Sequence, residues 1–223
     1  MDKERLIGIG KIVGMVLGIM WLASSMGFGQ KNDLPEKFSL FDGETLDGWQ
    51  TANPVHQDLW YVKDSIITGG DGEVFIEENT YLCTKEEFED FEFSCLFRLT
   101  GGPEGFINSG IQYRSQIVDG DIVGYQADIG DGFWGDIYDE HRRGKLVDGD
   151  LSVLSKILNK GGWNSYLIRC RGDLHEIYIN GIQTARYVET DPSIPKKGVI
   201  GFQNHDGGKS KVEFKDIFIT IFP

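Results

Sequence analysis

The sequence has few cysteines and fewer basic than acidic residues. Its three cysteines, Cys83, Cys95 and Cys170, are too few for a scaffold built on several disulfides. Lysine and arginine number 22 against 35 aspartates and glutamates, which gives a formal net charge of −13. Nucleic-acid binding needs clustered cations to neutralise phosphate, so we expect no nucleic-acid partner.

The apolar segment near the N-terminus is shorter than a typical membrane span. The stretch IVGMVLGIMWLA (12–23) follows the charged MDKERLIGIGK and precedes the small residues of SSMGFGQ. A spanning helix needs about 20 apolar residues, whereas a secretory signal peptide has a shorter apolar region. The pattern predicts a signal peptide over residues 1–29, export to the periplasm or outside the cell, and no stable membrane insertion after cleavage. An uncleaved anchor is the alternative.

The cysteines also lack the spacing of a metal site. No C-x-x-C or His-x-x-x-His pattern occurs. Cys95 alternates with phenylalanines in FEFSCLFRL (91–99), and Cys170 alternates with Tyr166 and Ile168. We therefore expect both cysteines to behave as small buried apolar residues.

No long segment has helical periodicity, and most of the chain alternates apolar and polar residues in short runs. Gly172-Asp173 and Asn180-Gly181 separate three such runs in WNSYLIRCRGDLHEIYINGIQTARYVE, which predicts a meander. A further hairpin is expected around Lys63-Asp64. Roughly a dozen strands favour an all-β fold of two packed antiparallel sheets. We expect a linker over 30–37 and one domain over 38–223, with a short helix in LSVLSKILNK (151–160).

Three expected strands carry an i, i+2 pair of polar residues on one face. The solvent face of a sheet usually collects Lys, Glu and Thr, whereas these pairs combine amides with an arginine, an aspartate and a histidine. Such groups bind a hydroxyl-rich ligand through directional hydrogen bonds. A plain solvent face is the alternative. The pairs are Gln112 with Arg114, Gln126 with Asp128, and Gln203 with His205.

The stretch GYQADIGDGFWGDIYDEHRRGKL (124–146) continues one of these strands into a charged loop. Trp134 and Tyr138 could supply apolar platforms for sugar rings, or could instead cover the edge of the core. Arg142 and Arg143 lie in a mixed-charge run, which is usually a solvated surface. Because the run directly follows a polar pair, we include both arginines among the expected substrate-binding residues.

Five segments in order resemble the 3-keto-disaccharide hydrolase domain, and the resemblance covers nearly all of the expected mature chain. It implies a concanavalin A-like jelly-roll sandwich, export in glycan-degrading bacteria, and activity on glycosides oxidised to a ketone at sugar C3. This chain has GYQAD where the family more often has GYEVQ, and Gln112 replaces the usual aromatic after NSGI. The segments are FSLFDGETLDGW (38–49), FEDFEFSCLFRL (88–99), INSGIQYRS (107–115), WNSYLIRCRGDLHEIYINGIQTARY (163–187) and GVIGFQNHDGGKSKVEFKDIFI (198–219).

A C3 ketone acidifies the hydrogen at C2, so abstraction of that proton can expel the oxygen at C1. The chemistry needs a base, a group that stabilises the enolate, and an acid for the leaving group. His205 is the expected base, Arg114 the enolate partner, and Asp128 or Glu140 the acid. The expected substrate is a small oligosaccharide or glycoside.

Three alternatives stay open at this point. A divalent metal could carry the enolate charge on Asp128, Glu140 and His205, although their spacing matches no recognisable metal motif. A conventional two-carboxylate glycosidase could use acids of EFEDFE (87–92). A carbohydrate-binding module without catalysis fits the same fold.

Overall fold

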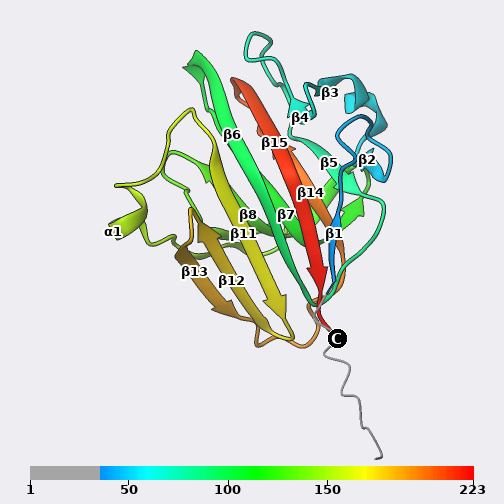
Figure 1. Cartoon of the computed structure of the whole chain (residues 1–223), viewed down its shortest axis with the longest axis vertical. Helices are drawn as coiled ribbons and strands as arrows, with labels where there is room; N and C mark the ends of the chain where they lie inside the picture. Colours follow the sequence, from blue (N-terminus) through cyan, green and yellow to red (C-terminus); the bar gives the residue numbers. More distant parts are fainter. Residues whose placement is uncertain (1–35) are drawn as a thin grey trace, which may run out of the picture. The chain divides into compact units, whose positions relative to one another are not determined.

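Alternation of apolar and polar residues produces strands with one buried face. In the computed structural model, which describes residues 36–223, these strands pair into two antiparallel sheets (Figure 1). The predicted signal peptide and the predicted linker up to residue 35 lie outside the described residues. Within residues 36–223, no helix has the length and apolar character needed to cross a membrane.

The first sheet has eight strands, and β6 and β15 run through its centre as its longest members. Its order is β13-β12-β11-β6-β15-β4-β3, and β1 pairs with β15. The strands are β1 (Lys37–Ser39), β3 (Trp60–Lys63), β4 (Ile66–Gly69), β6 (Phe91–Gly105), β11 (Asn164–Arg171), β12 (Leu174–Ile179), β13 (Ile182–Val188) and β15 (Gly208–Ile221).

The second sheet has seven strands in the order β10-β9-β8-β7-β14-β5-β2. The three strands with predicted polar pairs are β7, β8 and β14, which are direct neighbours. These strands are β2 (Trp49–Thr51), β5 (Thr80–Thr84), β7 (Asn108–Val118), β8 (Asp121–Gly130), β9 (Ile137–Glu140), β10 (Gly144–Val147) and β14 (Val199–Asn204). The short helices are η1 (Pro54–Leu59) and α1 (Leu151–Leu154). The predicted all-β sandwich is confirmed.

The main core lies between the two sheets. Phe93 and Phe97 from β6 pack there with Phe202 from β14, and Phe202 stacks on Phe214 of β15 at a ring-centroid distance of 3.8 Å. Each fully buried phenylalanine contributes about 1.5–3 kcal/mol through removal of apolar surface from water. All three cysteines are buried and free, which confirms that Cys95 and Cys170 act as small core residues.

The predicted turns form with one small shift. Asn180 and Gly181 both have positive φ, as a type I′ turn requires, and they join β12 to β13. The hairpin of β3 and β4 turns at Asp64 and Ser65, with φ of 52° and 58°, one residue beyond the predicted position. The predicted short helix is α1, which Asp150 caps by accepting from the Ser152 backbone N–H.

The hairpin of β7 and β8 bends over the outer face of its own sheet. A register shift interrupts the pairing between Tyr113 and Gln116, and Gly124 approaches Ser115 so closely that a Cβ would lie 2.5 Å from its Oγ. Beyond the bend, Ile122 packs with Tyr81 of β5 in a second small apolar cluster. Because β7 and β14 separate β8 from β5 in the sheet, this contact requires a strong curl that closes one end of the concave face.

Candidate active site

A cavity of about 150 Å³ opens at the other end of this concave face. It combines two carboxyl groups, one imidazole, two amides and three aromatic rings. Five of the eleven predicted site residues line it: Gln126, Asp128, Tyr138, Glu140 and His205. The other lining residues are Phe106, Asn108 and Phe133.

Strand register explains why these groups meet. Gln126 of β8 lies opposite Tyr138 of β9, and Gly124 lies opposite Glu140. Since side chains two residues apart share a face, Gln126, Asp128, Tyr138 and Glu140 project from the same side of the sheet. The loop after β14 adds His205 to the group.

Asp128 is only 3% exposed, and this burial is the main cause that raises the pKa of its carboxyl to about 8. Negative charge on Asp136 and Glu140 acts in the same direction. The Gln126 amide opposes these effects because its Nε2 donates to Asp128 Oδ1 at 2.5 Å. At neutral pH, Asp128 is therefore a largely protonated acid facing the cavity.

Glu140 is a second carboxyl group with a raised pKa, and burial is again the largest cause. The charges of His141 and His205 oppose burial and lower this pKa. His141 Nε2 lies 3.5 Å from Glu140 Oε1 and 3.2 Å from Asp121 Oδ2. Glu140 thus lies within electrostatic range of two imidazoles, and one of these also lines the cavity.

The His205 ring is held at one nitrogen and by one aromatic contact. Its Nδ1 lies 2.9 Å from the Asp206 carbonyl oxygen and 3.0 Å from Asp206 Oδ1. Because both neighbours are acceptors, Nδ1 carries the proton of a neutral ring, and Nε2 keeps a free lone pair. Phe106 packs edge-to-face on the ring at 4.9 Å, and Phe133 packs on Phe106 at 5.7 Å.

The prediction that Gln112 and Arg114 share a face is wrong. Arg114 has a φ of 49° within the β7 irregularity, so the alternation of side chains breaks there. Its guanidinium points away from the cavity and donates to Asp90 Oδ1 at 2.9 Å and to the Glu89 and Gly172 carbonyls at 2.8 Å. Glu89 and Asp90 directly precede β6, and Gly172 lies in the turn between β11 and β12, so Arg114 connects parts of the first sheet.

Three more predicted residues lie away from the cavity. Trp134 is 7% exposed and packs against Phe97 in the main core, so it covers the core edge. Arg142 donates from Nε to both oxygens of the fully buried Asp139 at 2.9 Å, and Arg143 donates to the same carboxylate at 2.5 Å. The two arginines thus neutralise a buried acid.

Gln112 and Gln203 lie behind the cavity wall. Gln112 Nε2 donates to Gln126 Oε1, which links it to the cavity through a neighbour. Gln203 Nε2 donates to the Tyr81 hydroxyl at 3.3 Å, and its Oε1 is buried without a hydrogen-bond partner. The curled hairpin therefore buries amides that were predicted to touch substrate directly.

The sequence interpretation missed three lining residues. Asn108 precedes Gly110 and Gln112 on the same face of β7, so its even position was a usable signal. Phe106 and Phe133 lie in connections outside regular strands, where no periodicity marks a residue as facing a site.

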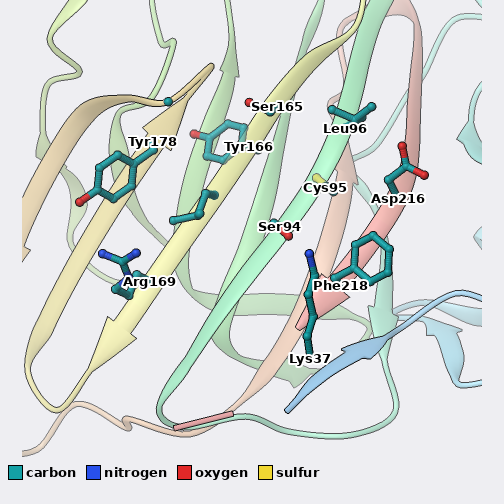
Figure 2. A pocket seen from close by; sticks show the side chains of 12 residues that line it. Lys37, Ser94, Cys95, Leu96, Ser165, Tyr166, Arg169, Tyr178, Asp216 and Phe218 are labelled. Atoms are coloured by element: carbon teal, nitrogen blue, oxygen red, sulfur yellow. The ribbon is translucent and has the colours of Figure 1, made fainter. Parts of the chain in front are cut away.

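A larger hollow of about 660 Å³ lies on the outer face of the first sheet (Figure 2). Its cations already have partners: Arg169 lies 2.6 Å from Glu92, and Lys37 lies over the Phe218 ring at 4.2 Å. The hollow has no pair of buried carboxyl groups, so the smaller cavity is better suited to proton transfer.

Two chemical alternatives gain no support from this arrangement. In the EFEDFE run, Asp90 binds Arg114 and Glu92 binds Arg169, and none of its residues lines the cavity. Across the described part of the chain, no group of three or more His, Cys, Asp or Glu side chains is arranged to hold a metal ion.

Comparison with known proteins gives a family and a fold. A family model described as a 3-keto-alpha-glucoside-1,2-lyase-like domain matches residues 37–220. No curated protein matches the chain. Among solved structures, a candidate glycosyl hydrolase from Parabacteroides distasonis ATCC 8503 has a TM-score of 0.63 and 20% identity, covering 84% of this chain and 94% of that one.

Two further structures share the fold. A second candidate glycosyl hydrolase from Parabacteroides distasonis ATCC 8503 has a TM-score of 0.58 and 23% identity, covering 84% of this chain and 100% of that one. The carbohydrate binding module CBM66 from Bacillus subtilis has a TM-score of 0.58 and 15% identity, covering 78% of this chain and 95% of that one. The predicted jelly-roll sandwich is confirmed.

Proposed function

The chain belongs to the 3-keto-alpha-glucoside-1,2-lyase-like domain family, and we propose that it cleaves glycosides whose sugar ring carries a ketone at C3. The family indicates a carbohydrate-active or carbohydrate-binding protein. One observation carries the finer proposal. A single small cavity contains a buried carboxyl, Asp128, whose pKa burial raises to about 8, together with an imidazole, His205, that is held through Nδ1 by Asp206.

The first step is removal of the proton at sugar C2. Neutral His205 accepts it at Nε2, and the electron pair of the C2–H bond forms the C2–C3 double bond of an enolate, with negative charge on the C3 oxygen. Glu140 stabilises the resulting imidazolium, since it already lies within electrostatic range of His205. The Asn108 amide replaces Arg114 as the proposed hydrogen-bond donor to the enolate oxygen, because Asn108 lines the cavity.

The second step breaks the glycosidic bond. The enolate restores the C3 ketone, a double bond forms between C1 and C2, and the C1–O bond breaks. Asp128 gives its proton to the departing oxygen, which is the role of a carboxyl group kept neutral by burial. Addition of water across C1 and C2 then gives the hydrolysis product, while its omission gives elimination.

Export to the periplasm or the cell exterior is part of the proposal. The apolar run 12–23 with its charged flank supports a signal peptide, as expected for an enzyme that meets glycans outside the cytoplasm.

In the test, purified protein is incubated with a 3-keto-disaccharide or with its unoxidised parent, each with and without a chelator. Mass spectrometry then measures the sugar that is released. Cleavage of the keto compound alone supports the enolate mechanism. Loss of activity with chelator would assign the enolate charge to a metal, and cleavage of the parent alone would favour an ordinary glycosidase.

Substitution of the acid separates an enzyme from a binding module. We expect Asp128→Asn to lower turnover by about 10²–10⁴-fold, the usual contribution of a general acid, while sugar affinity measured by calorimetry changes little. Sugar binding by the unaltered protein without any cleavage would instead identify a non-catalytic module.

A further inference from the structure

A chain of buried amides ends on the proposed acid. Gln112 Nε2 donates to Gln126 Oε1, and Gln126 Nε2 donates to Asp128 Oδ1 at 2.5 Å. At the far end, Ser115 Oγ lies 3.3 Å from Gln112 Oε1. All four side chains are at most 3% exposed, and of these Gln112 and Ser115 do not line the cavity.

The donor and acceptor direction of these side-chain hydrogen bonds depends on the charge of Asp128. Whenever Asp128 is ionised, its carboxylate can only accept hydrogen bonds, so Gln126 then presents its NH₂ group to Asp128 and its oxygen to Gln112. Gln112 then presents NH₂ to Gln126 and turns its oxygen towards the Ser115 hydroxyl. That hydroxyl also lies 3.0 Å from the Tyr113 carbonyl and 3.1 Å from the Tyr125 carbonyl. In this orientation each of the two amide NH₂ groups faces an acceptor when Asp128 is ionised, and Oδ2 is left to carry the proton when Asp128 is neutral.

We infer that Gln112 and Gln126 are positioning residues that hold Asp128 through Oδ1 and reserve Oδ2 for proton transfer in the cavity. The inference rests on the proposed function for its catalytic meaning. The hydrogen-bond chain itself is a property of the folded protein, so it can be tested without substrate.

Other ionisable groups surround Asp128 but do not replace this contact. Glu140, His205 and Tyr138 line the same cavity, and Asp136 lies nearby with Lys145 Nζ 2.8 Å from its Oδ2. The Tyr166 hydroxyl donates to the backbone carbonyl of Asp128 at 3.1 Å. Gln126 is the side chain that donates directly to the Asp128 carboxyl within the described residues.

Gly110 gives Gln126 the space it needs. Gly110 lies opposite Asp128 in the β7–β8 pairing, and a Cβ there would lie 2.4 Å from Gln126 Cδ. The three atoms nearest to that Cβ all belong to the Gln126 side chain. Gly110→Ala should therefore displace Gln126, and it should do so without backbone strain because Gly110 has no positive φ.

The experiment is a pH titration of the Asp128 carboxyl carbon by ¹³C NMR, with the signal assigned by its loss in Asp128→Asn. In Gly110→Ala, which displaces Gln126, we expect the pKa of Asp128 to rise by about 1 unit, the equivalent of one charge-assisted hydrogen bond. In Gln112→Met, which removes the donor to Gln126 and leaves Gln126 itself in place, we expect a smaller rise in the same direction. Met matches Gln in shape, so Gln112→Met removes the donor and keeps the volume.

Matched controls lie outside the amide chain. Gln116→Met removes an amide that binds the Lys197 carbonyl, and Gly102→Ala adds a Cβ whose nearest atom is 3.6 Å away. Both should leave the Asp128 titration unchanged. An unchanged pKa in folded Gln112→Met and Gly110→Ala proteins would overturn the inference.

The activity measurement separates this inference from the proposed function. If the protein cleaves 3-keto-glycosides, the limb of the pH–rate profile that reports Asp128 should shift to higher pH in both variants. A uniform loss of rate with no movement of that limb would indicate a structural role only. If no glycoside is cleaved, the NMR shift still decides whether the amides hold Asp128.

Discussion

Arg114 is predicted to stabilise the fold and to take no part in chemistry. Replacement by methionine keeps most of the buried aliphatic length and removes the guanidinium. It deletes donors to Asp90, Glu89 and Gly172, and these contacts join the entrance of β6 to the β11–β12 turn.

The expected cost is about 3 kcal/mol. Removal of one partner of a buried ion pair costs about 3–5 kcal/mol, because the other partner is left uncompensated. The Arg114 side chain has no exposure, but Asp90 is 28% exposed and can recover part of its hydration. The lower end of the range therefore applies.

Urea denaturation followed by circular dichroism measures this cost at 25 °C. Arg186→Met is the matched control, since Arg186 is exposed on β13, and it should change stability by less than about 0.5 kcal/mol. Turnover of folded Arg114→Met should stay close to that of the unaltered protein. A stable variant that has lost turnover would refute this reasoning and return Arg114 to the chemistry.

Three further predictions concern side chains with rings. Burial, followed by the Arg114 charge, lowers the pKa of His175 to about 3, so its neutral form contributes stability above pH 6.5 that is lost as pH falls towards 3. Between pH 6.5 and 5, the free energy of unfolding, measured from urea midpoints, should therefore fall by about 2 kcal/mol less in His175→Gln than in the unaltered protein. Trp134→Ala should cost about 3–5 kcal/mol in the same assay with little change in KM, because Trp134 lies in the core. Phe133→Ala should instead weaken sugar binding by about tenfold, and equal effects of the two variants on KM would contradict this assignment.

Much of the fold could be predicted because its signals are local. Asn180-Gly181 determines a tight turn through backbone conformation alone, and the alternation in FEFSCLFRL determines which face of β6 is buried. The pairing of Asp128 with Gln126 on one face follows from the same rule. These properties depend on neighbours two or three residues away, so the sequence contains them.

The site was harder to predict because it depends on contacts between distant segments. The alternation rule failed at Arg114, where an irregular residue with positive φ turned the side chain to the other face. Trp134 and Phe133 are adjacent in the sequence, yet one packs in the core and the other lines the cavity. No local pattern distinguishes two neighbouring aromatic residues in a loop.

Alternation and turn chemistry are local, so the strands, most of the turns and the sandwich class could be read from the sequence, and five of the predicted site residues do line the cavity. The neighbourhood of β14, β7 and β8 and the curl of the β7–β8 hairpin over the sheet depend on contacts between distant segments and became visible in the folded chain. In the folded chain Gln112 and Gln203 are buried, the cavity has a volume of about 150 Å³, and burial raises the pKa of Asp128 to about 8. Burial depends on what the whole chain places around a group, and this is the physical reason that the protonation of the site could not be predicted from the sequence.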